Sequence, residues 1–227
     1  MKLYRLPPLF LQSLFWAPTR IILKIFTDFE VRGISNVQNL PRGVIFVSNH
    51  QSELDPILIT ASLPFLSHHF PMFYTSREKS FYIKSGWRQI FYGGLFFKMW
   101  GAYPVRVGLR DYGDSLVCHA EIIKDGGSVC IFPEGKRTVD NKIGPVKGGA
   151  AYLSYVTKAP IVPVKIEGVW RTSPKDFFWR KRKCRITIGQ PIFPDEIFFG
   201  KSMLFLGVPD DDCVLATRRV MDEVVSL

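Results

Sequence analysis

The sequence predicts a single-domain α/β protein with a mixed sheet covered by helices on both faces. Short apolar segments without a clean polar alternation are separated by segments of helical pattern, which is typical of strands buried on both sides. Apolar residues make up 47% of the 227 residues and charged residues 22%. That composition supplies a core without disulfides, and the length fits one domain better than two.

Four apolar segments that end at turn or polar residues are expected to be strands: residues 43–48, 127–132, 159–166 and 184–188. Helices are expected at residues 56–63, 111–124, 148–157 and 211–225. The polar motifs of the chain follow these strands. Sheets of this class bind ligands beyond the carboxyl ends of their strands, so the motifs are expected to meet at one edge.

The N-terminal segment is uncharged and apolar over residues 6–19. It is shorter than the roughly 20 residues that a transmembrane helix needs, and prolines interrupt it. A secretory signal would need a small-x-small cleavage site, which Phe15–Pro18 does not supply.

Residues 19–29 combine an apolar face with Arg20 and Lys24, the pattern of a helix that lies in a membrane interface. The sequence therefore predicts a membrane-interfacial helical segment over residues 1–28 and a main domain over residues 29–227. An ordinary helix packed on the core is the alternative.

The chain carries 30 Lys and Arg against 20 Asp and Glu, a formal charge of +10. This excess indicates an anionic partner, which could be nucleic acid, an acidic membrane surface or a phosphorylated small molecule. The four cysteines stand far apart with no C-x-x-C pair and no clustered His. Neither a metal site nor a disulfide framework is therefore expected, and the cysteines are interpreted as reduced.

Two stretches mix aromatic and basic residues. Residues 80–100 do so throughout, which suits stacking on nucleic-acid bases, a lipid interface or a buried core helix. The basic run at residues 180–183 follows Phe177, Phe178 and Trp179, which favours an anchor on anionic lipid headgroups. A solvated loop is the alternative for this second stretch.

His50 and Asp55 stand five positions apart at the end of the first predicted strand. An imidazole there can accept a proton at neutral pH, and a nearby carboxylate can fix its tautomer. The spacing alone is a weak signal. Asp55 before Pro56 is also a good helix start, and Ser52-x-x-Asp55 is similar to a capping box.

A second polar motif follows the second predicted strand and contains Glu134, Gly135, Lys136 and Arg137. Glycine lets a ligand approach the backbone closely, while Lys and Arg bind phosphate. A third element, Gly-Ala-Tyr-Pro-Val-Arg, ends at Arg106. By itself Arg106 could equally be a surface residue.

In order and spacing, these motifs resemble those of the glycerolipid acyltransferase family, whose best-known members are the 1-acylglycerol-3-phosphate acyltransferases. The resemblance rests on Asn-His-x-Ser-x-x-Asp, Gly-x-x-Pro-Val-Arg, Phe-Pro-Glu-Gly-x-Arg and Ile-Val-Pro-Val, and covers residues 29–191. Two departures leave the acceptor headgroup open: Lys136 replaces the more frequent Thr or Ser, and Tyr103 replaces the usual Phe or Ile.

The resemblance implies that His50 is the general base and that Asp55 orients it. It implies that Arg106, Glu134, Gly135 and Arg137 hold the acceptor's glycerol phosphate, with Lys136 as an additional cation. The expected reaction moves a fatty acyl group from acyl-CoA or an acyl carrier protein to the free hydroxyl of a lysophospholipid. The favoured lysophospholipid is 1-acyl-sn-glycerol-3-phosphate. Glycerol-3-phosphate or another lysolipid is the alternative acceptor.

No metal or cofactor beyond the thioester co-substrate is expected, and the protein is expected at the cytoplasmic face of a membrane. A nucleic-acid-binding protein would share the positive charge but leave the ordered motifs unexplained, so no nucleic-acid partner is expected. A non-catalytic lipid-binding relative would have less reason to keep both His50 and Asp55.

Overall fold

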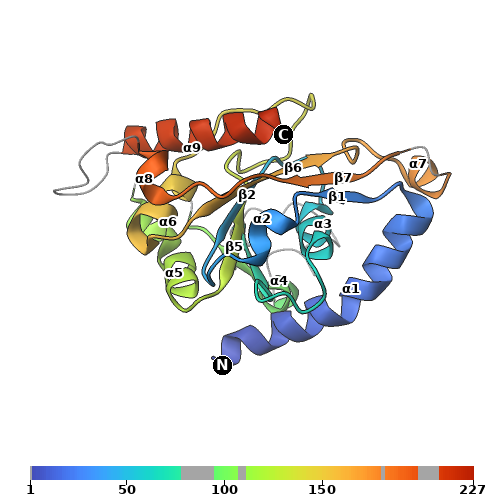
Figure 1. Ribbon diagram of the computed structural model, residues 1–227, viewed down its shortest axis with the longest axis horizontal. Helices are drawn as coiled ribbons and strands as arrows, with labels where there is room; N and C mark the ends of the chain where they lie inside the picture. Colours follow the sequence, from blue (N-terminus) through green and yellow to red (C-terminus); the bar gives the residue numbers. More distant parts are fainter. Residues whose placement is uncertain (1, 78–94, 107–110, 180–181, 199–209) are drawn as a thin grey trace.

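The computed structural model describes residues 2–77, 95–106, 111–179, 182–198 and 210–227 (Figure 1). Its strands are β1 (Glu30–Arg32), β2 (Ile45–Ser48), β3 (Met72–Ser76), β4 (Ala102–Pro104), β5 (Ser128–Ile131), β6 (Ile161–Glu167) and β7 (Arg185–Ile188). Its helices are the 3-10 turn Leu3–Arg5, α1 (Leu6–Phe26), α2 (Ser35–Gln38), α3 (Asp55–Ser62), α4 (Leu95–Trp100), α5 (Tyr112–Lys124), α6 (Gly149–Thr157), α7 (Pro174–Phe178), α8 (Pro194–Ile197) and α9 (Asp210–Ser226).

The strands form one seven-stranded sheet in the order β1-β7-β6-β2-β5-β3-β4. All neighbouring pairs are parallel except β6 and β7, which are antiparallel. The sheet is therefore mixed, as the sequence predicts. The carboxyl ends of β2, β3, β4, β5 and β6 lie along a single edge, and β7 begins at that edge because Glu167 pairs with Arg185.

Helices cover both faces of the sheet, which confirms the predicted class. In β2, Ile45 and Val47 pack on the face covered by α5, α6 and α9, while Phe46 packs on the face covered by α1 and α3. Figure 1 shows α9 and α1 on opposite sides of the sheet. Every residue of β2 is buried, which explains why its sequence shows no polar alternation.

The four predicted strands correspond to β2, β5, β6 and β7, but β1, β3 and β4 were not anticipated. β1 and β4 are edge strands of three residues each, too short to give a pattern. β4 also ends at Pro104, and proline is a weak strand signal because it has no N–H to donate to a neighbouring strand.

The N-terminus forms one continuous 21-residue helix, α1, rather than an interrupted segment followed by a separate helix. Pro7 and Pro8 fall in its first turn, where backbone N–H groups lack helical partners anyway. Pro18 lies inside the helix without ending it. With the preceding turn, residues Leu3–Phe26 are long and apolar enough to cross a membrane by length and composition alone, so the expectation that the segment is too short was wrong.

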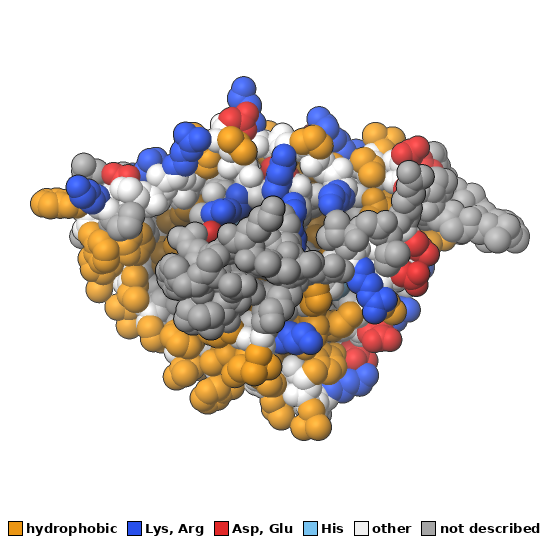
Figure 2. Space-filling view, turned by 180° about the vertical axis from the view of Figure 1, so that it is seen from behind, with side chains coloured by type: hydrophobic (Ala, Val, Ile, Leu, Met, Phe, Trp, Pro, Cys, Tyr) orange, Lys and Arg blue, Asp and Glu red, His pale blue; other side chains and the backbone are white. Residues whose placement is uncertain are grey.

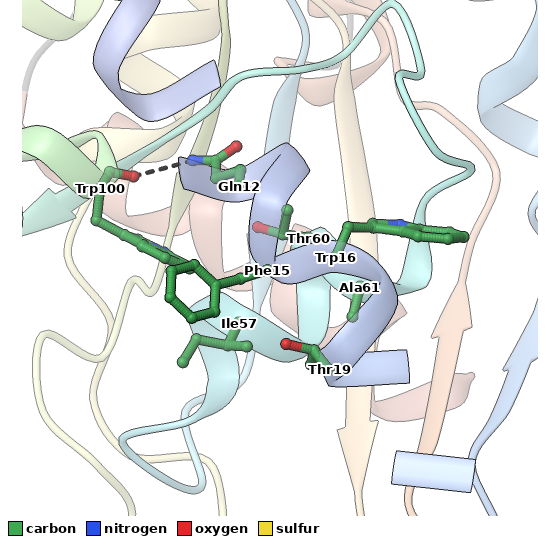
Figure 3. A pocket seen from close by; sticks show the side chains of 8 residues that line it. All are labelled: Gln12, Phe15, Trp16, Thr19, Ile57, Thr60, Ala61 and Trp100. Atoms are coloured by element: carbon green, nitrogen blue, oxygen red, sulfur yellow. Dashed lines mark hydrogen bonds between the residues drawn. The ribbon is translucent and has the colours of Figure 1, made fainter. Parts of the chain in front are cut away.

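One face of α1 is fixed to the domain by polar side chains. Gln12, only 1% exposed, donates from Nε2 to the carbonyl oxygens of Met72 and Trp100 and accepts from the Met72 amide. Trp16 donates to the Leu63 carbonyl and Arg20 to that of Ala61. Figure 3 shows the small pocket that these contacts enclose between α1, α3 and the end of α4.

Candidate active site

His50 and Asp55 are in direct contact at the carboxyl end of β2. His50 Nδ1 lies 2.8 Å from Asp55 Oδ2. Asp55 is fully buried, whereas the His50 side chain is 19% exposed. Among the described residues His50 Nε2 forms no hydrogen bond, so this nitrogen is the one presented to the adjoining cleft.

The Asp55 carboxylate holds the turn that carries His50. Its Oδ2 also accepts from the backbone amides of Gln51 and Ser52, at 2.6 and 2.9 Å, and its Oδ1 accepts from the Ser52 hydroxyl at 2.9 Å. α3 begins at Asp55 with Leu54 at its N-cap, and no side chain caps it. The interpretation of Asp55 as a helix cap was therefore wrong, because its oxygens turn back to the residues before the helix.

The loop after β5 is tied to the same turn. Glu134, 7% exposed, accepts from the His50 amide at Oε1 and from the Gly144 amide at Oε2. The Thr138 amide donates to the His50 carbonyl. The His50 ring stacks on Phe132, with ring centroids 4.4 Å apart. These contacts fix the position of the imidazole from the backbone and from one ring face.

A large cleft opens at this edge of the sheet, and His50 lines it together with residues from both predicted phosphate motifs. Gly135, Lys136, Arg137 and Arg106 all border it. Glu134 is not among its lining residues, since both carboxylate oxygens bind backbone amides. Its direct contact with substrate stays a prediction, while its observed contacts position His50.

In the described part of the lining, the lysines and arginines are seven: Arg77, Arg106, Lys136, Arg137, Lys147, Arg171 and Arg182. The only acidic residue in the described lining is Glu53, which pairs with Arg137 at 3.1 Å. The cleft is therefore strongly positive, which attracts anionic substrates.

Three of these cations had no role in the sequence analysis. Arg77 follows β3 and donates from Nε and Nη2 to the Gly135 carbonyl, at 3.0 and 2.6 Å. Lys147 lies beside Gly135, since a Cβ on that glycine would stand 3.7 Å from Lys147 Nζ. Arg171 follows β6. Each stands just beyond a strand or loop of the site edge, and that position is the signal that could have found them.

Much of the remaining wall is apolar and comes from several elements. Figure 2 shows that on one face of the molecule the hydrophobic side chains gather below the cations. The apolar lining residues include Leu23, Leu54, Ile57, Phe96, Phe97, Trp100, Phe177 and Phe178. The expected aromatic–basic stretch at residues 80–100 lies mostly outside the described residues, but its last part forms α4 and contributes Phe96, Phe97 and Trp100.

The two buried thiols whose pKa values are affected by Asp55 are not set up as nucleophiles. Cys184 lines the cleft, yet burial, and secondarily the Asp55 charge, raises its pKa to about 12. Burial likewise raises the pKa of Cys130 well above its ordinary value. Only the thiolate is strongly nucleophilic, so both thiols stay protonated and unreactive at neutral pH.

The four residues of the predicted lipid anchor, 180–183, do not all have the same surroundings in the structure. Arg180 and Lys181 lie outside the described residues. Arg182 faces the cleft, and Lys183 is exposed beside Asp28 at 3.8 Å.

The comparisons with known proteins agree with these motifs. A model of the family described as "Acyltransferase" matches residues 28–167, more than half of the chain. The chain belongs to this acyltransferase family.

Among its relatives is the 1-acyl-sn-glycerol-3-phosphate acyltransferase of Bacillus subtilis, 30% identical over 70% of this chain and 72% of the relative. The chloroplastic 1-acyl-sn-glycerol-3-phosphate acyltransferase BAT2 of Brassica napus is 30% identical over 74% of this chain and 46% of the relative. The chain thus spans about half the length of this and several other curated relatives.

The fold is also that of a solved structure. The crystal structure of the 1-acyl-sn-glycerophosphate (LPA) acyltransferase PlsC from Thermotoga maritima covers 96% of this chain and 78% of that one. The TM-score is 0.63 and the sequence identity 24%. At this identity the likeness supports the α/β fold.

Proposed function

We propose that the protein transfers a fatty acyl group from a thioester donor to the free hydroxyl of 1-acyl-sn-glycerol-3-phosphate, giving phosphatidate. The observation that carries this proposal is the His50–Asp55 contact at a cleft with basic residues on its rim and apolar residues on its wall. The names of the relatives supply the acceptor.

The transfer is direct. His50 Nε2 takes the proton of the acceptor hydroxyl while the oxygen attacks the thioester carbonyl carbon. The tetrahedral intermediate then collapses, the carbon–sulfur bond breaks, and His50 passes to the leaving thiolate the proton that it took from the hydroxyl. The buried Asp55 carboxylate holds the Nδ1 proton and stabilises the imidazolium that forms between the two steps. The reaction calls for no cofactor beyond the thioester co-substrate.

The acceptor phosphate binds on the β5, β3 and β4 side of His50. Arg137, Lys136 and Arg106 supply positive charge there, and Arg77 holds the Gly135 turn from which the first two extend. A planar guanidinium matches phosphate oxygens in pairs, so Arg137 is the better phosphate ligand of this loop. Its partner Glu53 is surface-exposed, and the phosphate dianion of the acceptor can replace it on Arg137, because exposed ion pairs contribute at most about 1 kcal/mol.

The protein works at a membrane surface, on the cytoplasmic side. The face of α1 opposite its polar contacts is apolar and open, with Phe10 66%, Leu14 54%, Ile21 57% and Ile25 51% exposed. A helix fixed to the domain along one side and apolar along the other is suited to lie in the interface rather than to cross the bilayer alone.

An acceptor screen tests the proposed function. Purified protein in vesicles is given acyl-CoA or acyl carrier protein thioester with each of four acceptors, and free thiol release is followed. The acceptors are 1-acyl-sn-glycerol-3-phosphate, glycerol-3-phosphate, a lysophosphatidylcholine and a monoacylglycerol. Rapid release with the first acceptor alone is expected. Preference for glycerol-3-phosphate or for a neutral acceptor would contradict the assignment of the acceptor.

A further inference from the structure

The cations of the cleft fall into two groups on either side of His50. Strand order places β5, β3 and β4 on one side of β2 and β6 and β7 on the other. Lys136, Arg137, Arg77 and Arg106 follow strands of the first side. Arg171 follows β6, and Arg182 precedes β7, which starts at the same edge.

Arg171 and Arg182 are held close to the site by the backbone around them. Gly168 approaches the start of β7 so closely that a Cβ there would stand 1.7 Å from the Lys183 carbonyl oxygen. Arg171 lies over the Trp170 ring at 4.8 Å and donates to the Val139 carbonyl, in the loop after β5, at 3.3 Å. Its φ is +48°, a conformation uncommon for a residue with a side chain.

Within the described part of the chain, no carboxylate neutralises either arginine. Among the described residues, Arg171 and Arg182 form no ion pair, and the single acidic lining residue, Glu53, pairs with Arg137 on the other side. One phosphate dianion on the acceptor side leaves this second group of charges without a partner. An uncompensated cationic group in a cleft indicates a second anionic ligand.

We propose that Arg171 and Arg182 bind the phosphate groups of the thioester donor. This inference rests on the proposed function and assigns the donor to the β6–β7 side of His50, opposite the acceptor phosphate. Coenzyme A carries a diphosphate and a further phosphate beyond its pantetheine arm, and a carrier protein carries one phosphate at the same arm. Both donors therefore present phosphate beyond a neutral arm that leads to the thioester.

This placement gives each substrate its own route to the base. The acceptor hydroxyl approaches His50 from the β5 side and the thioester from the β6 side, so the two anionic ends stay apart. The apolar side chains of Phe177 and Phe178 line the same cleft and belong to α7, which lies between Arg171 and Arg182 in the sequence. They can cover the first part of the acyl chain.

The experiment measures donor binding and donor turnover separately. The double variant Arg171→Gln/Arg182→Gln is compared with wild type and with Arg218→Gln, an exposed arginine of α9 outside the cleft lining. Binding of free CoA is measured by titration calorimetry without acceptor. Loss of two charge-assisted contacts should weaken CoA binding by about tenfold or more, with Arg218→Gln unchanged.

Turnover measurements test whether the two arginines recognise the phosphate groups of the donor. In the double variant, kcat/KM for acyl-CoA should fall by about tenfold or more, while KM for the acceptor changes less than about twofold. An acyl-N-acetylcysteamine thioester, which has no phosphate, should be used equally well by the variant and wild type. A parallel series with acyl carrier protein shows which donor the pair selects.

Three results would overturn the inference. The first is that the double variant binds both CoA and the phosphopantetheinylated carrier protein as tightly as wild type does. The second is that its kcat/KM falls equally with the phosphate-free thioester. The third is that it loses binding to anionic vesicles while its donor kinetics stay intact. The third result would assign the two arginines to lipid headgroups. If wild type releases no thiol with any acceptor, the proposed function fails, but the calorimetry still decides whether the pair binds donor phosphates.

Discussion

Asp55 links the chemistry of the site to its stability, because one buried carboxylate accepts from four donors. These are His50 Nδ1, the amides of Gln51 and Ser52, and the Ser52 hydroxyl. Asp55→Asn keeps one carbonyl oxygen for the amides and His50, and the Ser52 hydroxyl can rotate to accept from the new amide. It removes the negative charge that stabilises the imidazolium.

We therefore expect Asp55→Asn to lower kcat by about one to three decades, less than the loss of the base itself, with a small change in the free energy of unfolding. Asp55→Ala should instead lower the free energy of unfolding by about 2–4 kcal/mol, since it leaves buried donors unpaired. Steady-state kinetics and urea titration of both variants separate the two roles. Equal destabilisation by both substitutions would contradict this division.

Arg137 is expected to act on acceptor binding. Arg137→Ala should raise KM for 1-acyl-sn-glycerol-3-phosphate by about tenfold or more and leave kcat for a phosphate-free acceptor unchanged. Arg218→Ala, on an exposed face of α9, is the matched control. A loss of kcat with unchanged KM would show that Arg137 does not serve the acceptor phosphate.

At the scale of elements, α1 combines a polar attachment with an apolar outer face. Gln12 satisfies three backbone groups at once, two carbonyls and one amide. Gln12→Leu should lower the free energy of unfolding by about 2–4 kcal/mol, because those buried groups lose their partners. Gln38→Leu, at an exposed position of α2, should leave it nearly unchanged in the same urea titration. Similar effects of the two substitutions would contradict the proposed attachment.

The outer face of α1 is expected to determine membrane binding. Phe10→Ser/Ile21→Ser should reduce partitioning into vesicles by about tenfold or more, since each side chain would otherwise leave water. The thermal midpoint should stay close to wild type because both side chains are exposed. Leu215→Ser is the control, on α9 at the opposite side of the sheet (Figure 1). Equal partitioning of all three proteins would exclude α1 as the contact surface.

For the whole molecule, two buried histidines make stability depend on pH. Burial lowers the pKa of both His69 and His119 to about 4 from an ordinary value of 6.5. His69 is hydrogen-bonded to Ser128 and Val37. The backbone of Tyr74 and Tyr103 approaches His119, but neither ring nitrogen forms a hydrogen bond of acceptable geometry among the described residues.

As pH falls, the unfolded chain takes up protons near pH 6.5, whereas the folded chain does so only near pH 4. The two neutral histidines therefore contribute fully to the free energy of unfolding above pH 6.5. As the pH falls to 4, this free energy decreases progressively, by about 3 kcal/mol for each histidine. Urea titration at pH 7 and pH 5 measures this loss. His119→Leu should reduce the difference between the two pH values, and an unchanged difference would contradict the assignment to His119.

The sequence alone was enough to predict the class of fold and the region of the chain that forms the site. Buried segments such as β2 and β5 give continuous apolar patterns, and the ordered motifs identify which loops carry polar groups. The sequence alone did not predict the three-residue edge strands or the continuity of α1 through Pro18, since both depend on tertiary packing.

Cations such as Arg77 and Arg171 were missed for a different reason. Each follows a strand whose neighbours in the sheet come from distant parts of the sequence, so only the strand order shows which side of His50 it occupies. Arg182 also lines the cleft, while the prediction that residues 180–183 anchor the protein on lipid headgroups stays a prediction.

The central claim, that His50 is the base of a direct acyl transfer, is tested by comparing wild type with His50→Ala in thiol release from acyl-CoA. The acceptor is 1-acyl-sn-glycerol-3-phosphate, and the thermal midpoint verifies that the variant is folded. Removing a general base should lower kcat/KM by about two to four decades, with no covalent acyl-protein detected in either protein. Acceptor-dependent thiol release by folded His50→Ala at a rate close to that of wild type would contradict the account.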